Sequence, residues 1–298
     1  MSGRVMYGLL AVVVVSFGVN WPVMSAGVRH ISPVWMGAFR VGSSLLVFAC
    51  MAVARGRLRL PPRSDWPIVA SLALFGMSAV NILVFTALQI VPPGRSSVLT
   101  WTTPLWAVPI AAVFLGDRMT RSRWAGLALG IAGVVVLFEP WRLDWGDRQV
   151  VVGHLLLLLA AVINAAVSVH IRGHRWTITP LDALPWQLAG ATAVLSLVAW
   201  LTEGAPRVEW TPLLVGNVAY QGVLVSGLAL WAQIVIFRNI DPVSANLSMM
   251  GVPAIGVAAS AVFAAEAVTF EVAAGLALIV SGVAVHLLSD RQRKPVDM

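Results

Sequence analysis

The chain has 298 residues, of which 59 % are hydrophobic and only 11 % are charged. Soluble domains carry roughly 45 to 50 % apolar and about 25 % charged residues, so this composition predicts an integral membrane protein. The net charge of +7 is then expected at the membrane flanks and does not indicate nucleic-acid binding.

Apolar stretches divide the whole chain. A bilayer-spanning helix needs about 20 apolar residues, and ten stretches joined by short links fit that description. They cover residues 5–26, 33–54, 66–90, 94–115, 122–138, 150–171, 180–202, 211–237, 242–263 and 268–288. The sequence therefore predicts an all-α integral membrane protein with ten transmembrane helices. Almost nothing remains for a DNA-binding or cytosolic catalytic module.

The first stretch could also be a cleaved signal peptide, because Arg4 precedes it and small residues follow it. An internal correspondence favours a retained helix instead. Pro33 and Arg40 follow the first stretch, and their counterparts 147 positions later, Pro180 and Gln187, follow the sixth. The sixth stretch is thus the repeat partner of the first.

Basic residues gather in alternate links, and this bias sets the orientation of a membrane protein. With the N-terminus inside, 14 of the 20 Lys and Arg residues fall on cytoplasmic segments and five on outer segments. Both termini are therefore expected to be cytoplasmic. The single Cys50 cannot form an internal disulfide and is interpreted as an inert packing residue.

The chain contains a repeat displaced by 149 positions. PLWAVPIAAVFLGDRMT, residues 104–120, recurs as PAIGVAASAVFAAEAVT, residues 253–269, and residues 93–136 match their counterparts at 15 of 44 positions. Each copy holds five predicted helices, an odd number, so the second copy enters the membrane from the opposite side. We expect two inverted five-helix repeats, residues 1–140 and 141–298, of the kind that secondary transporters use around a midplane site.

The repeated residues resemble a known family. The two copies of the pattern read Pro104, Phe114-Leu115-Gly116-Asp117, Thr120, Gly126, Gly133 and Pro253, Phe263, Glu266, Thr269, Gly275, Gly282. This pattern is similar to the paired EamA modules of the drug/metabolite transporter superfamily. Phe17-Gly18-Val19-Asn20 resembles that family's Trp-Gly-x-Asn, with Phe in place of Trp. The resemblance implies a transporter of the inner membrane, most similar to YddG-type aromatic amino-acid exporters.

The prolines and glycines of the pattern have direct physical consequences. Pro104 and Pro253 lie inside apolar helices, where each frees the backbone carbonyl four residues earlier. Both helices should bend there. The bend either serves helix packing alone or exposes the freed carbonyl to a bound substrate. Asp117 and Glu266 are interpreted as capping residues. Close helix contacts are expected at the glycines in positions 126, 130, 133, 275 and 282.

Polar, aromatic and proline residues at membrane depth predict a binding pathway. They recur at helical spacing, so each set shares one helix face, and polar groups in lipid tend to face the bundle interior. Asn and Ser also join helices by hydrogen bonds, so a structural role stays open for each. The candidate substrate-binding residues are Asn20, Ser78, Asn81, Thr100, Trp101, Pro104, Trp186, Tyr220, Gln221, Asn246, Met250 and Pro253.

Arg40 is the one charge placed within an apolar span. It lies about 10 Å along the second helix, at 1.5 Å per residue. It could snorkel outward or pair with a helix-end carbonyl, and such a structural role is the favoured interpretation. It could instead meet a substrate carboxylate.

Acidic and catalytic groups are missing where pumps and enzymes need them. All 13 acidic residues lie in links or at helix ends, whereas proton-coupled drug pumps commonly use an acid inside the membrane. The sequence holds no metal-ligand cluster, no P-loop and no nucleophile elbow, so we expect no catalytic residue, metal or cofactor.

The sequence therefore predicts a secondary transporter that exports small neutral or zwitterionic solutes, with aromatic or bulky apolar amino acids as the first choice. Alternating access would operate without obligatory proton coupling. Trp101, Tyr220 and Trp186 would cover the apolar side chain, and the amides of Asn81, Gln221 and Asn246 would bind the ammonium and carboxylate groups.

Other functions stay open. A transporter of nucleosides, sugars or other metabolites would use the same amides and aromatic rings, and a proton-coupled drug exporter is a further alternative. An intramembrane enzyme or a lipid scramblase is a remote one. The expected partners are a small-molecule substrate and the lipid bilayer, without nucleic acid. The oligomeric state is open, a monomer being one option.

Overall fold

The computed structural model describes residues 3–116, 120–138, 147–229, 232 and 249–291. These residues form helices and links without a β-strand, which confirms the all-α class. Six of the helical stretches are long and apolar enough to span a bilayer, and four shorter apolar helices accompany them. Each of the ten predicted stretches overlaps one of these helices, while ten complete crossings stay a prediction.

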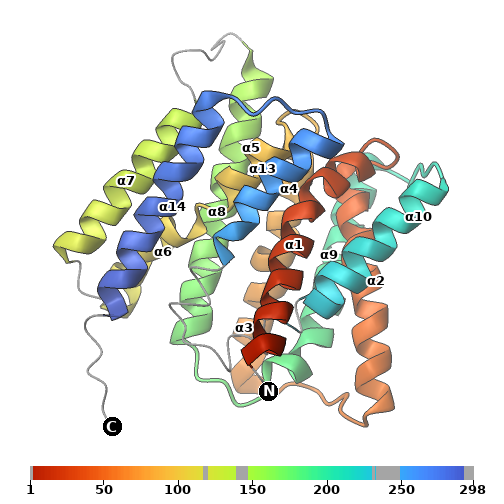
Figure 1. Cartoon of the computed structure of the whole chain (residues 1–298). Coiled ribbons are helices and arrows are strands. Elements are labelled where there is room, and N and C mark those ends of the chain that lie inside the picture. Colours follow the sequence, from red (N-terminus) through yellow and green to blue (C-terminus); the bar gives the residue numbers. More distant parts are fainter. Residues whose placement is uncertain (1–2, 117–119, 139–146, 230–231, 233–248, 292–298) are drawn as a thin grey trace.

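The helices follow one another in two series (Figure 1). The first series is α1 (Gly3–Gly27), α2 (Pro33–Ala54), η1 (Arg63–Asp65), α3 (Trp66–Ser71), the π-helical η2 (Leu72–Ala79), α4 (Val80–Ala87), α5 (Pro93–Thr100), α6 (Thr103–Leu115) and α7 (Arg121–Phe138). The second is α8 (Arg148–Gly173), α9 (Pro180–Glu203), α10 (Pro212–Ala219), the π-helical η3 (Tyr220–Ala229), α13 (Gly251–Phe263) and α14 (Phe270–Arg291). Helices α2, α5, α9 and α10 begin with proline, whose missing N–H is no loss in a first turn.

The two series pack against each other as inverted copies. Helix α7 runs antiparallel along α14, and α2 along α9, so equivalent helices of the two halves form these pairs (Figure 1). Helix α1 packs along α13 just as α8 packs along α6, and η2 contacts α9 just as η3 contacts α2. Inverted repeats related by a twofold axis give such pairs of equivalent contacts, in which each half takes the place of the other. The start of α1 and the end of α14 lie on the same side of the bundle (Figure 1).

Glycines bring α7 and α14 together. A Cβ on Gly133 would lie 2.8 Å from the carbonyl oxygen of Gly275. A Cβ on Gly282 would lie 2.5 Å from that of Gly126. Only glycine permits such an approach, so the predicted close contact is confirmed at these four positions. The repeat offset of 149 carries Gly126 onto Gly275 and Gly133 onto Gly282, so one contact is the image of the other.

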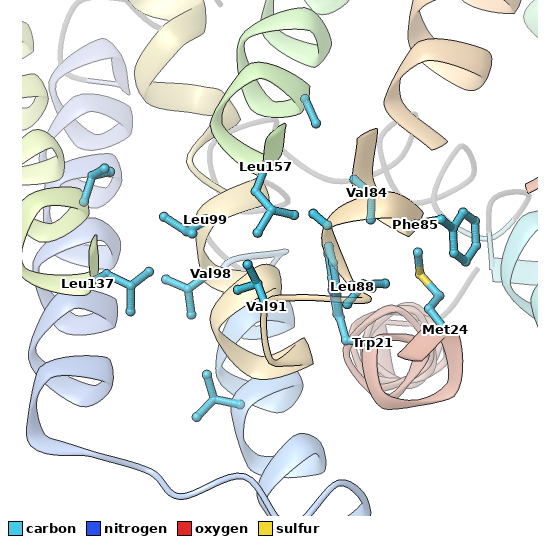
Figure 2. Close-up of a cluster of buried hydrophobic side chains, with 14 of the residues drawn as sticks. Trp21, Met24, Val84, Phe85, Leu88, Val91, Val98, Leu99, Leu137 and Leu157 are labelled. Atoms are coloured by element: carbon cyan, nitrogen blue, oxygen red, sulfur yellow. The ribbon is translucent and has the colours of Figure 1, made fainter. Parts of the chain in front are cut away.

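One large apolar cluster joins the first helix to the centre of the bundle. Figure 2 shows its side chains converging from α1, α4, α5, α7, α8 and the link after α4. Its members include Trp21, Met24, Val84, Phe85, Leu88, Val91, Val98, Leu99, Leu137 and Leu157. Because lipid tails are as apolar as these side chains, the cluster stabilises the bundle through close packing.

Carboxylates fasten helix ends across the two halves. Glu266 accepts hydrogen bonds from the backbone N–H groups of Gly94 (2.7 Å) and Arg95 (3.2 Å) at the start of α5, which confirms its capping role. Its counterpart Asp117 lies outside the described residues. Glu203, the last residue of α9, accepts from two backbone N–H groups in the first turn of α2.

Asp65 makes a similar connection on the other side of the bundle. Its buried carboxylate accepts hydrogen bonds from His174 Nε2 (2.8 Å), Thr177 Oγ1 (2.7 Å) and the Ile178 N–H (2.8 Å). The α2–α3 link is thereby tied to the α8–α9 link. Cys50 is exposed on α2, so its interpretation as a packing residue is wrong.

The glycine contact between α7 and α14 predicts that adding one methyl group there destabilises the protein. We expect Gly282→Ala to lower the thermal midpoint of unfolding in detergent, because overpacking costs about 1 to 3 kcal/mol. Gly8→Ala is the matched control, since a Cβ there meets no atom within 4 Å. Equal midpoints for the two variants would contradict the contact.

Candidate functional site

The helix that carries the first repeated proline is interrupted. Trp101 and Thr102 separate α5 from α6 just before Pro104, at the bend that the proline predicts. In the second half, α13 begins immediately after Met250, three residues before Pro253. The residues that precede α6 and α13 share one backbone conformation, with φ −72° and ψ −4° at Thr102 and φ −66° and ψ −12° at Met250.

Threonine hydroxyls pair the carbonyls at the first break. Thr103 Oγ1 donates to the carbonyl oxygen of Thr100 at 2.9 Å, the group that Pro104 leaves without an N–H. Thr102 Oγ1 donates to that of Leu99 at 2.6 Å. In this half the structure therefore favours a packing kink over a substrate-binding carbonyl.

The second break has a different composition. The positions equivalent to the two threonines hold Gly251 and Val252, which carry no hydroxyl. The carbonyl of Met249, four residues before Pro253, cannot be paired in the same way. The two halves thus share the break but differ in how its carbonyls are paired.

A small cavity of about 60 Å³ lies where the two breaks meet. Its lining residues are Trp101, Pro104, Met249, Met250, Pro253, Ile279, Val280 and Val283. Four of them were candidates from the sequence, one break residue and one proline from each half. The three residues of α14 were not, because α14 shows no polar stripe that would distinguish it from a packing helix.

The cavity can hold apolar groups. An aromatic ring, two thioethers, two prolines and aliphatic side chains form its wall, and pockets for small molecules are mostly apolar. A cavity of about 150 Å³ takes up benzene, so this one is too small for an aromatic side chain as it stands. A bulky substrate would enter only when the helices around the breaks move apart.

The Phe-Gly-Val-Asn motif of α1 supports one side of this region. Trp101 and Phe17 pack against the same buried cluster, which is formed by Leu10, Val13, Ala232, Met249 and Val252. A Cβ on Gly18 would lie 2.4 Å from Ile255 Cγ2, so glycine allows α1 and α13 to touch there. Asn20 lies about 200° around the helix from Gly18, at 100° per residue, and faces another neighbour.

That neighbour is the segment from α10 into η3. Asn217 Nδ2 donates to the carbonyl of Val23 at 2.5 Å, and Tyr220 Oη donates to that of Ser16 at 2.9 Å. Gln221 Nε2 donates to Asn217 Oδ1. Tyr220 therefore holds α1 against η3, and its aromatic ring is not among the residues that line the cavity.

Several buried polar oxygens in this region have no hydrogen-bond partner in the described structure. They are Asn20 Oδ1, Ser97 Oγ, Thr100 Oγ1, Gln221 Oε1 and Ser260 Oγ. Most buried polar atoms in proteins are paired. Three of these five belong to residues that the sequence nominated for substrate binding.

Other nominated residues lie apart from the cavity lining. Ser78 Oγ and Asn81 Nδ2 donate to backbone carbonyls of their own helix at 2.7 and 2.5 Å. Trp186 Nε1 donates at 2.8 Å to the carbonyl of Arg59 in the α2–α3 link, as an interfacial tryptophan would. Asn246 lies outside the described residues. For these residues the structure favours local or interhelical hydrogen bonding.

The π-helical segments have no signal in the sequence. They begin at Leu72 and Tyr220, which are 148 positions apart, so the same part of the third helix of each repeat is affected. Such segments occur frequently at functional sites. Within the described chain, no group of three His, Cys, Asp or Glu side chains could hold a metal ion.

Known proteins resemble this chain over nearly its whole length. The transporter YoaV of Bacillus subtilis, itself uncharacterized, is 23 % identical over 292 residues, which are 98 % of this chain and 99 % of that protein. A probable amino-acid metabolite efflux pump of Salmonella typhimurium is 25 % identical over 311 residues, covering 96 % of each chain. A crystal structure with 24 % identity covers 98 % of this chain and 100 % of its own with a TM-score of 0.68, so the fold is shared.

The family is defined by two matches. EamA-like transporters match residues 4–139 and, separately, residues 151–288. This confirms the resemblance seen in the paired proline, acid and glycine positions. The chain belongs to the EamA-like transporter family and is a multi-pass transporter of the cell membrane.

Proposed function

We propose that this transporter exports amino acids with aromatic or bulky apolar side chains. The observation that carries the proposal is the apolar cavity where the two helix breaks meet, lined by Trp101 and Met250 from equivalent positions of the two halves. The similarity to a protein named a probable amino-acid metabolite efflux pump supports the same substrate class. Family membership indicates a transporter rather than an enzyme.

The inverted halves supply the two states that alternating access needs. Contacts of α1 with α13 and of α8 with α6 are equivalent by the internal symmetry. Exchanging the conformations of the two halves therefore converts an opening toward one side into an opening toward the other. The breaks before Pro104 and Pro253 are the bending elements, because helices already lack regular hydrogen bonds there.

We further propose ten crossings with both termini cytoplasmic. In a chain with Cys50→Ser, a cysteine at Asp147 should then react with a membrane-impermeant maleimide added to intact cells, and a cysteine at Arg59 should not. Both positions are exposed and lie in different links. Labelling of the Arg59 position alone would contradict the orientation.

Trp101 is the residue whose loss should affect transport most directly. Removing its ring gives up an apolar contact worth about 1.5 to 3 kcal/mol, so Trp101→Ala should lower phenylalanine flux into proteoliposomes by roughly tenfold or more. Trp124→Ala is the control, because that ring is 58 % exposed on α7. Monodisperse behaviour in detergent would show that both variants fold. Equal fluxes of the two variants would assign Trp101 to packing.

Energy coupling follows from the position of the acids. The acidic residues of the described chain belong to links or to the end turns of helices, at Asp65, Asp147, Asp182, Glu203, Glu209, Glu266, Glu271 and Asp290. We propose that the substrate moves down its own gradient without stoichiometric proton exchange. Export then reflects a high internal concentration of the amino acid.

Proteoliposomes with the membrane potential clamped and an imposed pH gradient of either sign provide the measurement. Flux should follow the substrate gradient alone. Concentrative uptake driven by the pH step would contradict the proposal and would direct attention to His154, His170 and Asp182 as proton carriers.

A further inference from the structure

Arg40 points into the helix bundle. Its neighbours one turn away on the same helix face, Met36 and Ser44, are both 0 % exposed. The lipid-facing side of α2 lies elsewhere, at Leu46 and Val53, which are 68 % and 62 % exposed. The guanidinium reaches Met24 of α1, so the prediction that it snorkels outward is wrong.

The guanidinium has little to bind in the described structure. Arg40 Nη1 donates to the thioether sulfur of Met24 at 3.5 Å. Sulfur is a weak acceptor, and four further N–H donors belong to the same group. Within the described residues no carboxylate lies in ion-pair range of it. A cation held inside a membrane protein commonly marks a substrate or ion pathway.

Two buried amide oxygens accompany this cation. Asn20 Nδ2 donates to the same Met24 sulfur at 2.9 Å, while Asn20 Oδ1 has no partner. Gln221 is 0 % exposed, its Nε2 is bonded to Asn217, and its Oε1 has no partner. Both amides thus have an occupied donor and an unused acceptor.

Packing brings the three residues to one region between α1, α2 and η3. Arg40 and Asn20 bind the same sulfur atom. Ser44, one turn from Arg40 on α2, donates to the carbonyl of Gly222 at 3.3 Å, next to Gln221. Figure 2 shows Met24 projecting from α1 beside Phe85 of α4, within the cluster against which Trp101 also packs. Met24, which binds Arg40 and Asn20, and Trp101, which lines the apolar cavity, thus belong to one contiguous apolar cluster.

We propose that Arg40, Asn20 and Gln221 form the subsite for the charged groups of a zwitterionic amino acid. The guanidinium donates to the α-carboxylate, since planar bidentate binding of carboxylates suits arginine. The two amide oxygens accept from the α-ammonium group. This ligand gives the arginine a counter-charge and the two unpaired amide oxygens a donor, whereas a neutral sugar or a cationic drug leaves the arginine without a counter-charge. The inference rests on the proposed amino-acid transport and adds how its head group is recognised.

The experiment compares three substrates in proteoliposomes: phenylalanine, phenylalaninamide, which lacks the carboxylate, and 3-phenylpropionate, which lacks the ammonium. The wild-type protein should prefer phenylalanine at least tenfold over either analogue. Arg40→Gln should abolish the preference over phenylalaninamide, and Arg40→Lys should restore part of it. Gln221→Met should reduce the preference over 3-phenylpropionate. Arg55→Gln removes an exposed charge at the C-terminal end of α2, away from Arg40, and should change neither ratio.

The remaining outcomes show whether the subsite or the proposed transport function has failed. If Arg40→Gln lowers the fluxes of phenylalanine and phenylalaninamide equally, or changes neither flux, the proposed subsite is wrong, while the proposal of amino-acid transport stands. If the wild-type protein moves none of the three, the proposed function fails, and thermal stabilisation of the purified protein decides the subsite. Stabilisation by phenylalanine beyond that by phenylalaninamide supports it, and equal stabilisation overturns it. This last comparison uses the wild-type protein alone, so it holds even if Arg40→Gln does not fold.

Discussion

Within a bilayer, every backbone N–H and C=O group must find its partner inside the protein. Prolines remove a donor inside several helices, at Pro22, Pro109 and Pro185 among others, and the proposed site lies beside the two that the duplication repeats, Pro104 and Pro253. At Pro104 the deficit is repaired by threonine hydroxyls, which donate to the carbonyls of Leu99 and Thr100. At Pro253 no hydroxyl occupies the equivalent positions. The break before Pro104 therefore divides a membrane helix into segments that can bend, and α13 begins just before Pro253. A carbonyl left without an N–H donor at such a place is tolerated only against protein or a cavity.

Inversion of the duplicated half determines where these breaks lie. The repeat offset of 149 positions carries the contact of Gly133 with Gly275 onto that of Gly282 with Gly126. The same symmetry brings Trp101 and Met250 to one cavity. Neither half could enclose this site alone, because each contributes one break residue and one proline to the wall. The proposed transport follows from that arrangement, since two equivalent halves can exchange conformations around it.

Much of the fold could be predicted because apolar length, proline and glycine act through local chemistry. The helices, the bend at Pro104 and the glycine contacts of α7 with α14 are confirmed. The cap at Glu266 was also foreseen. The contribution of α14 to the cavity could not be predicted, because aliphatic residues such as its Ile279 and Val283 occur on any packing helix. The π-helical segments likewise have no compositional signature.

The site was harder to predict, because a polar side chain in a membrane helix fits both a ligand and a neighbouring backbone. Ser78 and Asn81 bond to carbonyls of their own helix, whereas the oxygens of Asn20 and Gln221 are left without partners. Only packing distinguishes these cases.

The central claim, substrate exchange by alternating access, is tested most directly by counterflow of labelled phenylalanine into proteoliposomes that contain this protein alone. The account predicts that unlabelled phenylalanine inside the vesicles accelerates uptake of labelled phenylalanine. It also predicts that the labelled compound recovered afterwards is still phenylalanine. Uptake that ignores the internal amino acid, or conversion of the label into another compound, would contradict it.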